Sequence, residues 1–304
     1  MARVLVTRML TGDALARLAA EHEVTVRDAP LPPSPEELRA AVADVDGLLC
    51  LLTERVDRDL LDAAPRLRAI ANYAVGTDNI DLALTRERGI PVGVTPDVLT
   101  EATADLAFAL LLAAARNLLA AAADARDGRW RTWEPAGWLG ADVHGATLGI
   151  IGFGRIGRAV ARRAEGFGMT IRTTAEATLD EVLTSSDFVS LHCPLTTATR
   201  HLIDSAALRR MRPTAILVNT ARGGVVDQAA LLEALRDGVI AGAAIDVTDP
   251  EPPPPGDPLF ATPNLLVAPH IGSATRAARA RMTELSVENL LAGLAGRPMP
   301  HPAG

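Results

Sequence analysis

The chain has 304 residues, 48% of them hydrophobic, and a formal net charge of −7. This length and composition describe a globular protein large enough for two domains. The chain contains 30 Arg and no Lys, which excludes chemistry that needs a lysine, such as Schiff-base formation or a P-loop. The acidic residues are spread along the chain, and no basic stripe suited to nucleic acid is present.

Neither cysteine suggests a disulfide or a metal site. Cys50 and Cys193 both lie in apolar runs and lack metal-ligand spacing, so we expect buried thiols in a reducing compartment and no bound metal. No signal segment precedes the first predicted strand, and the longest apolar stretch, Leu106 to Ala115, is too short to cross a bilayer. We therefore expect a cytoplasmic protein with no membrane segment.

The first part of the chain alternates apolar runs with helical patterns, which is typical of a mainly parallel α/β sheet. A helix is expected from Ser34 to Val45, where Ser34 and Glu37 suit a capping box. A second helix, from Leu99 to about Ala123, leads out of this region. Strands are predicted at 3–7, 24–27, 47–52, 67–73 and 91–94.

The second part contains the most informative motif. An apolar strand from Thr147 runs into Gly152-x-Gly154-x-x-Gly157 and then into an alanine-rich helix. A dinucleotide pyrophosphate needs such a tight turn, a residue without a side chain beside the phosphates, and the free N–H groups of a helix N-terminus. Further strands are predicted at 169–173, 188–192, 215–219, 240–247 and 265–268, which completes a six-stranded doubly wound domain.

The last predicted helix, Ala274 to Leu294, lies beyond the six strands and is long enough to return to the first part. We therefore expect one domain to comprise residues 1–98 and 276–304, and the other to comprise residues 99–275.

Three ionisable side chains follow different strands of the second domain: Arg222, Glu251 and His270. Ligands of open α/β sheets bind beyond the carboxyl ends of the strands, so these loops are expected to converge. Arg222 suits a carboxylate and could polarise a neighbouring carbonyl. His270 could donate a proton to the carbonyl oxygen, while Glu251 would orient the ring and favour the protonated imidazole. Taken singly, these residues could equally be a solvated arginine, a surface glutamate and a capped histidine.

With these motifs together, the sequence resembles the D-isomer-specific 2-hydroxyacid dehydrogenase family, and within it the glyoxylate/hydroxypyruvate reductase branch. The resemblance rests on seven segments in order: Leu49–Asp57, Ala74–Asp81, Thr95–Thr100, Gly149–Gly157, Asp246–Pro252, His270–Thr275 and Asn289–Gly293. It implies an α/β fold of two Rossmann-like doubly wound domains, with the nucleotide-binding domain inserted in a flavodoxin-like substrate domain. It also implies a homodimer that acts on a small 2-oxo or 2-hydroxy acid.

The resemblance assigns roles by position. Arg222, Glu251 and His270 match the catalytic trio. The residues that match substrate contacts are Leu51, Val75, Gly76, Trp138 and Ser273, with the Val75 and Gly76 amides on the carboxylate and Trp138 reaching a neighbouring subunit; Trp138 could otherwise be a simple core or interface aromatic. The residues that match cofactor contacts are Thr103, Gly152, Gly154, Arg155, Ile156, Gly157, Cys193, Pro194, Thr199, Thr220, Ala221, Asp246 and Gly272.

One segment departs from the family pattern. The residue that sorts NAD from NADP is expected about eighteen residues after Gly157, at Ala175, but the chain there runs almost directly into the next helix. Glu176 could accept hydrogen bonds from a ribose diol and favour NAD, whereas Arg172 could pair with a 2′-phosphate and favour NADP. The shortened connection predicts a shallow adenosine pocket, and it leaves NAD and NADP both open.

Two other functions fit the same sequence. A protein of this fold could sense the cofactor and recruit partners with little turnover, although the intact trio argues against it. A relative could also act on another small anion, such as phosphite.

Overall fold

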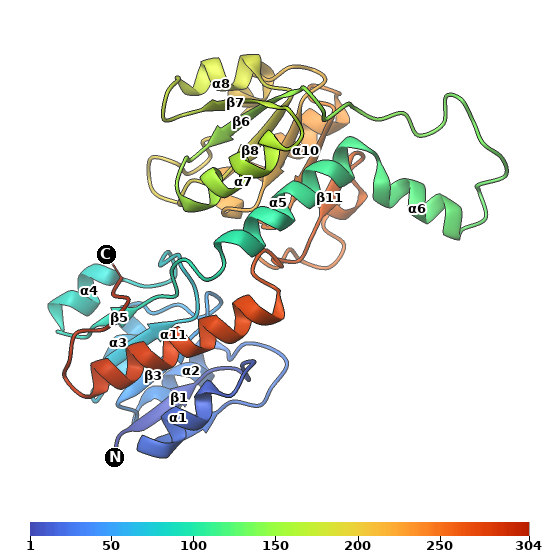
Figure 1. Cartoon of the computed structure of the whole chain (residues 1–304). Helices are drawn as coiled ribbons and strands as arrows, with labels where there is room; N and C mark the ends of the chain where they lie inside the picture. The colour runs from blue at the N-terminus through green and yellow to red at the C-terminus, as the bar shows by residue number, and fades with distance from the viewer. Residues whose placement is uncertain (304) are drawn as a thin grey trace. The chain divides into compact units, whose positions relative to one another are not determined.

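The computed structural model describes residues 1–303 (Figure 1). The chain forms two compact units, one of residues 1–99 with the chain from 274 onward and one of residues 100–273. The sequence placed these boundaries at residues 98 and 276.

The first unit is built on five parallel strands in the order β2-β1-β3-β4-β5, the flavodoxin-like arrangement. Its strands are β1 (Arg3–Val6), β2 (Glu23–Val26), β3 (Gly47–Cys50), β4 (Ala69–Asn72) and β5 (Val92–Gly93). Its helices are α1 (Ala14–Glu21), α2 (Pro35–Val42), α3 (Arg58–Ala63), α4 (Leu82–Glu87) and α11 (Arg276–Leu294).

Two helices of this unit follow directly from sequence signals. The capping box predicted at α2 is present, with the Glu37 amide donating to Ser34 Oγ and the Ser34 amide donating to Glu37 Oε2. Helix α11 packs on β3, β4 and β5. Its buried Asn289 donates to the Val94 carbonyl, and a Cβ at Gly93 would lie 2.5 Å from the Asn289 side chain. The last helix therefore completes the first sheet's core.

The second unit carries the predicted six strands, all parallel, in the order β11-β10-β9-β8-β6-β7. They are β6 (Thr147–Ile151), β7 (Thr170–Thr173), β8 (Phe188–Leu191), β9 (Ile216–Asn219), β10 (Gly242–Ile245) and β11 (Leu265–Val267). Its helices are α5 (Thr100–Ala115), α6 (Leu118–Arg126), α7 (Arg155–Glu165), α8 (Leu179–Ser185), α9 (Ser205–Arg210) and α10 (Gln228–Arg236), with two 3₁₀ turns at Gly223–Val225 and Pro258–Ala261. The first strand, β6, lies between β7 and β8, which makes it the point where the strand order reverses.

Both faces of this second sheet are buried. Along β9, Ile216 and Val218 join one apolar cluster while Leu217 joins the other, as expected for side chains that alternate between two covered faces. With both faces covered, the polar loops of this unit lie at the ends of its strands.

The expectation of one helix from Leu99 to Ala123 is wrong, because the helix breaks between α5 and α6. Asn117 adopts a left-handed conformation with φ of 51°. The Ala115 carbonyl accepts the Ala141 amide at 2.8 Å, and the Asn117 side chain donates to the Leu139 carbonyl at 2.9 Å. At the break, residues 139–141 therefore supply hydrogen bonds that a continuous helix would make within itself.

Among residues 1–303, no single helix has the length and hydropathy of a membrane span. Helices α5 and α6 meet those criteria only when taken together, and they are bent by 64° at their break.

Candidate active site

The three glycines of the turn between β6 and α7 have different surroundings. A Cβ at Gly152, whose φ is 92°, would lie 2.4 Å from the Cys193 amide nitrogen. A Cβ at Gly157 would lie 2.4 Å from the Gly152 carbonyl oxygen. Only Gly154, at the N-cap of α7, would place a Cβ in open space with nothing within 4 Å. Two glycines therefore let the turn pack closely, while the third leaves the helix N-terminus accessible to an anion.

Thr174 supports this turn and was not predicted as a site residue. Its Oγ1 accepts the Gly152 amide at 3.1 Å. The signal in the sequence was a hydroxyl-bearing residue directly after β7, the strand that neighbours β6.

The loops that follow the other strands are held side by side by backbone hydrogen bonds. The His192 amide donates to Ile151, the Asp246 amide to Asn219 and the Ala268 amide to Ile245, at 2.7–2.8 Å. The parallel ladder therefore continues to the point where each loop begins. This is the convergence that the sequence predicted for the second domain.

Arg222 lies in a loop organised by a buried asparagine. Asn219 Oδ1 accepts the Ala221 amide at 3.0 Å, and Asn219 Nδ2 donates to the Arg222 carbonyl at 2.9 Å. A Cβ at Gly223 would lie 2.0 Å from the Thr248 carbonyl oxygen, so the Arg222 loop rests on the loop that leads to Glu251. Asn219 was not predicted as a site residue, although a polar residue that ends a buried strand was a signal for it.

Glu251 and His270 are paired. Glu251 Oε1 lies 2.5 Å from His270 Nδ1, and Glu251 Oε2 accepts the Thr248 amide at 3.3 Å. The side chains keep 31% and 24% exposure, respectively. Because Nδ1 faces a carboxylate, Nε2 is the ring nitrogen left to exchange a proton with a ligand.

Asp246 fixes the backbone that presents this histidine. Its carbonyl accepts the His270 amide, and its buried carboxylate accepts the Ile271 and Gly272 amides, both at 2.7 Å. His270 itself has a left-handed φ of 54°. Burial raises the pKa of the Asp246 carboxyl, although the two amides oppose that shift.

Three further residues predicted to contact the cofactor are Thr199, Thr103 and Thr220. Thr199 Oγ1 donates to the Pro194 carbonyl at 2.6 Å, which closes the loop after Cys193. Thr103 in α5 is buried, and a Cβ at Gly272 would lie 3.4 Å from its methyl group. The buried Thr220 Oγ1 has no hydrogen-bond partner among the described residues.

His192 contrasts with His270 although it also follows a strand. Burial lowers the pKa of its imidazole to about 4. Its Nε2 lies 2.8 Å from Ser190 Oγ, and its Nδ1 has no partner within residues 1–303. This ring is neutral at physiological pH.

In the first unit, the structure brings Leu51 close to the Val75–Gly76 loop through two asparagines. Asn72 Nδ2 donates to the Gly76 carbonyl at 2.8 Å, and Asn79 Nδ2 donates to the Leu51 carbonyl at 3.1 Å. Within the described part of the chain, the amides of Val75 and Gly76 donate to no protein acceptor. These loops follow β3 and β4, again at carboxyl ends.

Trp138 lies elsewhere, in a long arm formed by α6 and residues 127–140 (Figure 1). Trp130, Trp133 and Trp138 are 74%, 80% and 47% exposed, and they line a cavity of about 470 Å³. The structure thus places Trp138 in the arm and not in the strand-end loops.

Comparisons with known proteins agree with this geometry. The model of the "D-isomer specific 2-hydroxyacid dehydrogenase, NAD binding domain" matches residues 108–272, more than half of the chain. A glyoxylate reductase of Korarchaeum cryptofilum is 49% identical over 98% of this chain and 95% of its own length. The chain belongs to the D-isomer specific 2-hydroxyacid dehydrogenase family.

Solved structures extend this assignment. A protein from Thermus thermophilus superposes with a TM-score of 0.93 at 50% identity, over 99% of this chain and all of that one. An NADPH-dependent glyoxylate/hydroxypyruvate reductase from Sinorhizobium meliloti, solved with NADP and malonate, gives a TM-score of 0.85 at 34% identity, over 100% of this chain and 97% of that one.

The second unit has the features that the dinucleotide of this dehydrogenase family requires. Gly154 faces open space at the N-terminus of α7, and the buried Thr220 hydroxyl lacks a protein partner. Among residues 1–303, no group of three or more His, Cys, Asp or Glu could hold a metal ion.

Proposed function

We propose that the protein reduces glyoxylate or hydroxypyruvate to the 2-hydroxy acid with NADH or NADPH, giving the D-isomer from hydroxypyruvate. The observation that carries this proposal is the Glu251–His270 pair, which lies at the same strand-end edge as the open glycine turn. The relatives named glyoxylate reductase support the choice of a small 2-oxo acid.

The cofactor pyrophosphate would be held by the glycine turn and Arg155, and its nicotinamide end by Thr103, Asp246 and Gly272. Bound there, the reduced nicotinamide supplies a hydride for the carbonyl carbon. Thr220 would use its unpaired hydroxyl on the same ligand, since an unmet buried hydrogen-bonding group is costly.

His270 would supply the proton. Glu251 holds Nδ1, so a protonated imidazole can donate from Nε2 to the carbonyl oxygen as negative charge develops there. The product is a hydroxyl group, and the neutral histidine regains its proton from solvent.

Arg222 would bind the substrate carboxylate and stabilise the charge on the reacting oxygen, because a guanidinium donates two hydrogen bonds in one plane. In the first unit, the Val75 and Gly76 amides are donors without a protein acceptor, and by resemblance we assign them to a substrate carboxylate. Leu51 and Ser273 complete the substrate contacts by resemblance.

The arm would join two copies into a homodimer in the cytoplasm. Three exposed tryptophans are an unusual amount of aromatic surface for a free monomer, and Trp138 would then reach the partner's substrate pocket. Sedimentation equilibrium measures the mass directly, and a monomer across the working concentration range would contradict this assembly.

A substrate panel tests the proposed reaction. Glyoxylate, hydroxypyruvate and pyruvate are each mixed with NADH or NADPH, and phosphite with the oxidised cofactors. The proposal predicts the highest kcat/KM for glyoxylate or hydroxypyruvate. Dinucleotide binding without turnover would indicate a sensing protein, and preference for phosphite would indicate a different dehydrogenase.

A further inference from the structure

The connection between β7 and α8 comprises only residues 174–178, and β7 is an edge strand of the second sheet. We propose that Glu176 in this connection selects NAD over NADP. The inference rests on the proposed function, because it concerns the adenosine end of the same dinucleotide.

Glu176 lies in a turn that is tied to the glycine motif. The Thr173 carbonyl accepts the amides of Glu176 and Ala177, at 3.2 and 3.0 Å. Thr174, two residues before Glu176, accepts the Gly152 amide. The turn at the end of β7 is therefore fixed directly beside the start of the phosphate-binding turn.

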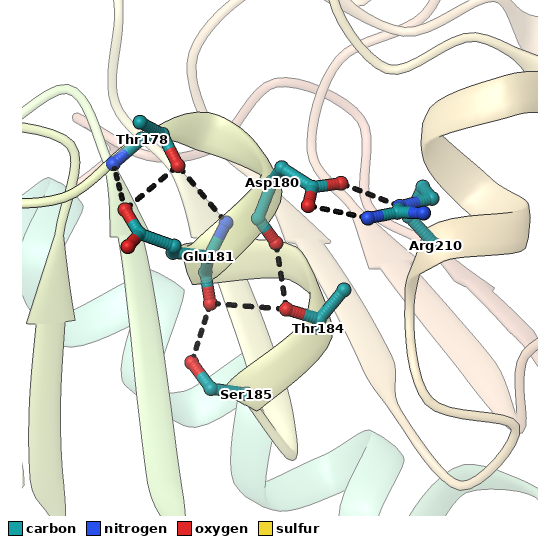
Figure 2. A network of polar contacts seen from close by, with 6 residues as sticks. All are labelled: Thr178, Asp180, Glu181, Thr184, Ser185 and Arg210. Atoms are coloured by element: carbon teal, nitrogen blue, oxygen red, sulfur yellow. Dashed lines mark hydrogen bonds and ion pairs between the residues drawn. The ribbon is translucent and has the colours of Figure 1, made fainter.

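The other carboxylates near the turn are already engaged, as Figure 2 shows. Glu181 accepts the Thr178 amide and hydroxyl at 2.8 and 2.7 Å, closing a capping box at the start of α8. Asp180 accepts two hydrogen bonds from Arg210 in α9. Glu176 differs, because its exposed carboxylate makes no hydrogen bond or ion pair within residues 1–303. It is thus available to a ligand.

Arg172, the candidate for a 2′-phosphate, is directed to another face. It pairs in register with Gly149 of β6, and a Cβ at Gly149 would lie 2.8 Å from Val182 in α8. Paired residues of neighbouring strands point to the same side, so Arg172 lies on the α8 face of the sheet. The Thr178 amide is the main group lowering the pKa of the Glu181 carboxyl, and the Arg172 charge adds to it.

The two cofactors differ only at the adenosine ribose. NAD carries a 2′,3′-diol there, and a carboxylate can accept both hydroxyl hydrogens. NADP carries a 2′-phosphate, which a carboxylate repels. Arg155 does not discriminate between them, because it lies within the glycine motif, where both cofactors carry the same pyrophosphate. The free carboxylate of Glu176 is therefore the feature that separates the two.

The test measures the dissociation constants of NADH and NADPH by quenching of protein fluorescence, at low and at high salt. We expect wild type to bind NADH at least roughly tenfold more tightly at low salt, the size of one charge repulsion near a surface. Salt screens this repulsion, so the ratio of the NADPH dissociation constant to the NADH dissociation constant falls as ionic strength rises. Glu176→Gln lowers this ratio mainly by strengthening NADPH binding, and Glu176→Arg reverses the preference.

Glu165→Gln is the matched control, because this exposed glutamate lies at the opposite end of α7 from the glycine turn. It leaves both constants unchanged. Equal binding of the two cofactors by wild type, or a ratio that Glu176→Gln does not alter, overturns the proposal while leaving the reductase function intact. Binding of neither cofactor overturns the proposed function instead.

Discussion

The two sheets begin with the same strand order but use their first strand-to-helix connection in opposite ways. In the first unit, the connection from β1 to α1 passes through Gly12, where a Cβ would lie 3.3 Å from Ala280 of α11. The Thr283 hydroxyl of the same helix donates to the Thr11 carbonyl at 2.8 Å. In the second unit, the connection from β6 to α7 exposes Gly154 to open space. Strand order alone therefore does not make a nucleotide site; the loop has to stay uncovered.

The second difference concerns the carboxylates of the two units. The strand ends of the second unit carry the Glu251–His270 pair, whereas a buried glutamate of the first unit forms hydrogen bonds within its own unit. Glu54 accepts the Thr7 hydroxyl and the Leu51 amide, both at 2.7 Å. A carboxylate that holds loops together is not available for proton transfer, so we assign the proposed proton transfer to the second unit.

The largest effect should come from His270→Ala. Loss of the proton donor is expected to lower kcat by roughly 10²–10⁴. Binding of NADH should change by less than about threefold, because the donor acts on substrate charge in the transition state. His201→Ala is a matched control, since His201 also has a left-handed φ, of 52°, but is not among the predicted site residues. Retention of more than about a tenth of wild-type turnover would remove His270 from the mechanism.

The second-largest effect is expected from Arg222→Lys, which should reduce kcat/KM by roughly 10²-fold. An ammonium keeps the charge but cannot make two coplanar hydrogen bonds. Steady-state kinetics with glyoxylate measure this loss. Unchanged kinetics would place Arg222 outside the reaction.

Two glycine substitutions test the comparison of the connections. Gly154→Ala should leave thermal stability unchanged and weaken dinucleotide binding by roughly tenfold or more, because the new methyl group enters the phosphate space. Gly12→Ala should leave binding unchanged and cost about 1–2 kcal/mol of stability, because its φ of 87° disfavours a side chain. Calorimetry and cofactor titration measure both. Equal effects of the two substitutions would show that the connections do not differ in this way.

The dependence of stability on pH also separates the two units. The buried His192 binds a proton only near pH 4 when folded but at about 6.5 when unfolded, so it weakens the fold as pH falls through that window. His192→Gln should flatten the stability profile there by up to about 3 kcal/mol. Chemical denaturation between these pH values measures the slope, and an unaltered slope would contradict a buried neutral ring.

In the first unit, the Asp46 carboxyl makes stability depend on pH at lower values. Burial disfavours the charged Asp46 carboxylate, but the Arg3 amide and Arg66 outweigh it, so the pKa of Asp46 is lowered. Its contribution to stability is present above the unfolded-state pKa and is lost as pH falls through the folded value. Asp46→Asn should therefore destabilise the protein at neutral pH but not in strong acid.

The sequence predicted the motifs better than the contacts that support them. Periodic apolar runs located the second sheet's six strands, and the glycine spacing predicted a tight turn, because both depend on local chain geometry. Thr174 was missed because its partner, the Gly152 amide, comes from a distant segment that only folding brings near. Asn219 was missed although its partners, the Ala221 amide and the Arg222 carbonyl, lie in its own loop, because the sequence does not show how that loop turns. The helix break at Asn117 was missed for the same reason, because Ala141 supplies its competing hydrogen bond from a distant segment.

The central claim is that Glu251 acts through His270 as an electrostatic partner. The most direct measurement is kcat for glyoxylate reduction, at saturating cofactor, for wild type and Glu251→Gln. The amide preserves a hydrogen bond to the ring but removes the negative charge beside it, so kcat should fall by roughly tenfold or more while the NADH dissociation constant stays unchanged. An unchanged kcat would contradict the coupling of Glu251 to His270 and leave the proton donor unassigned.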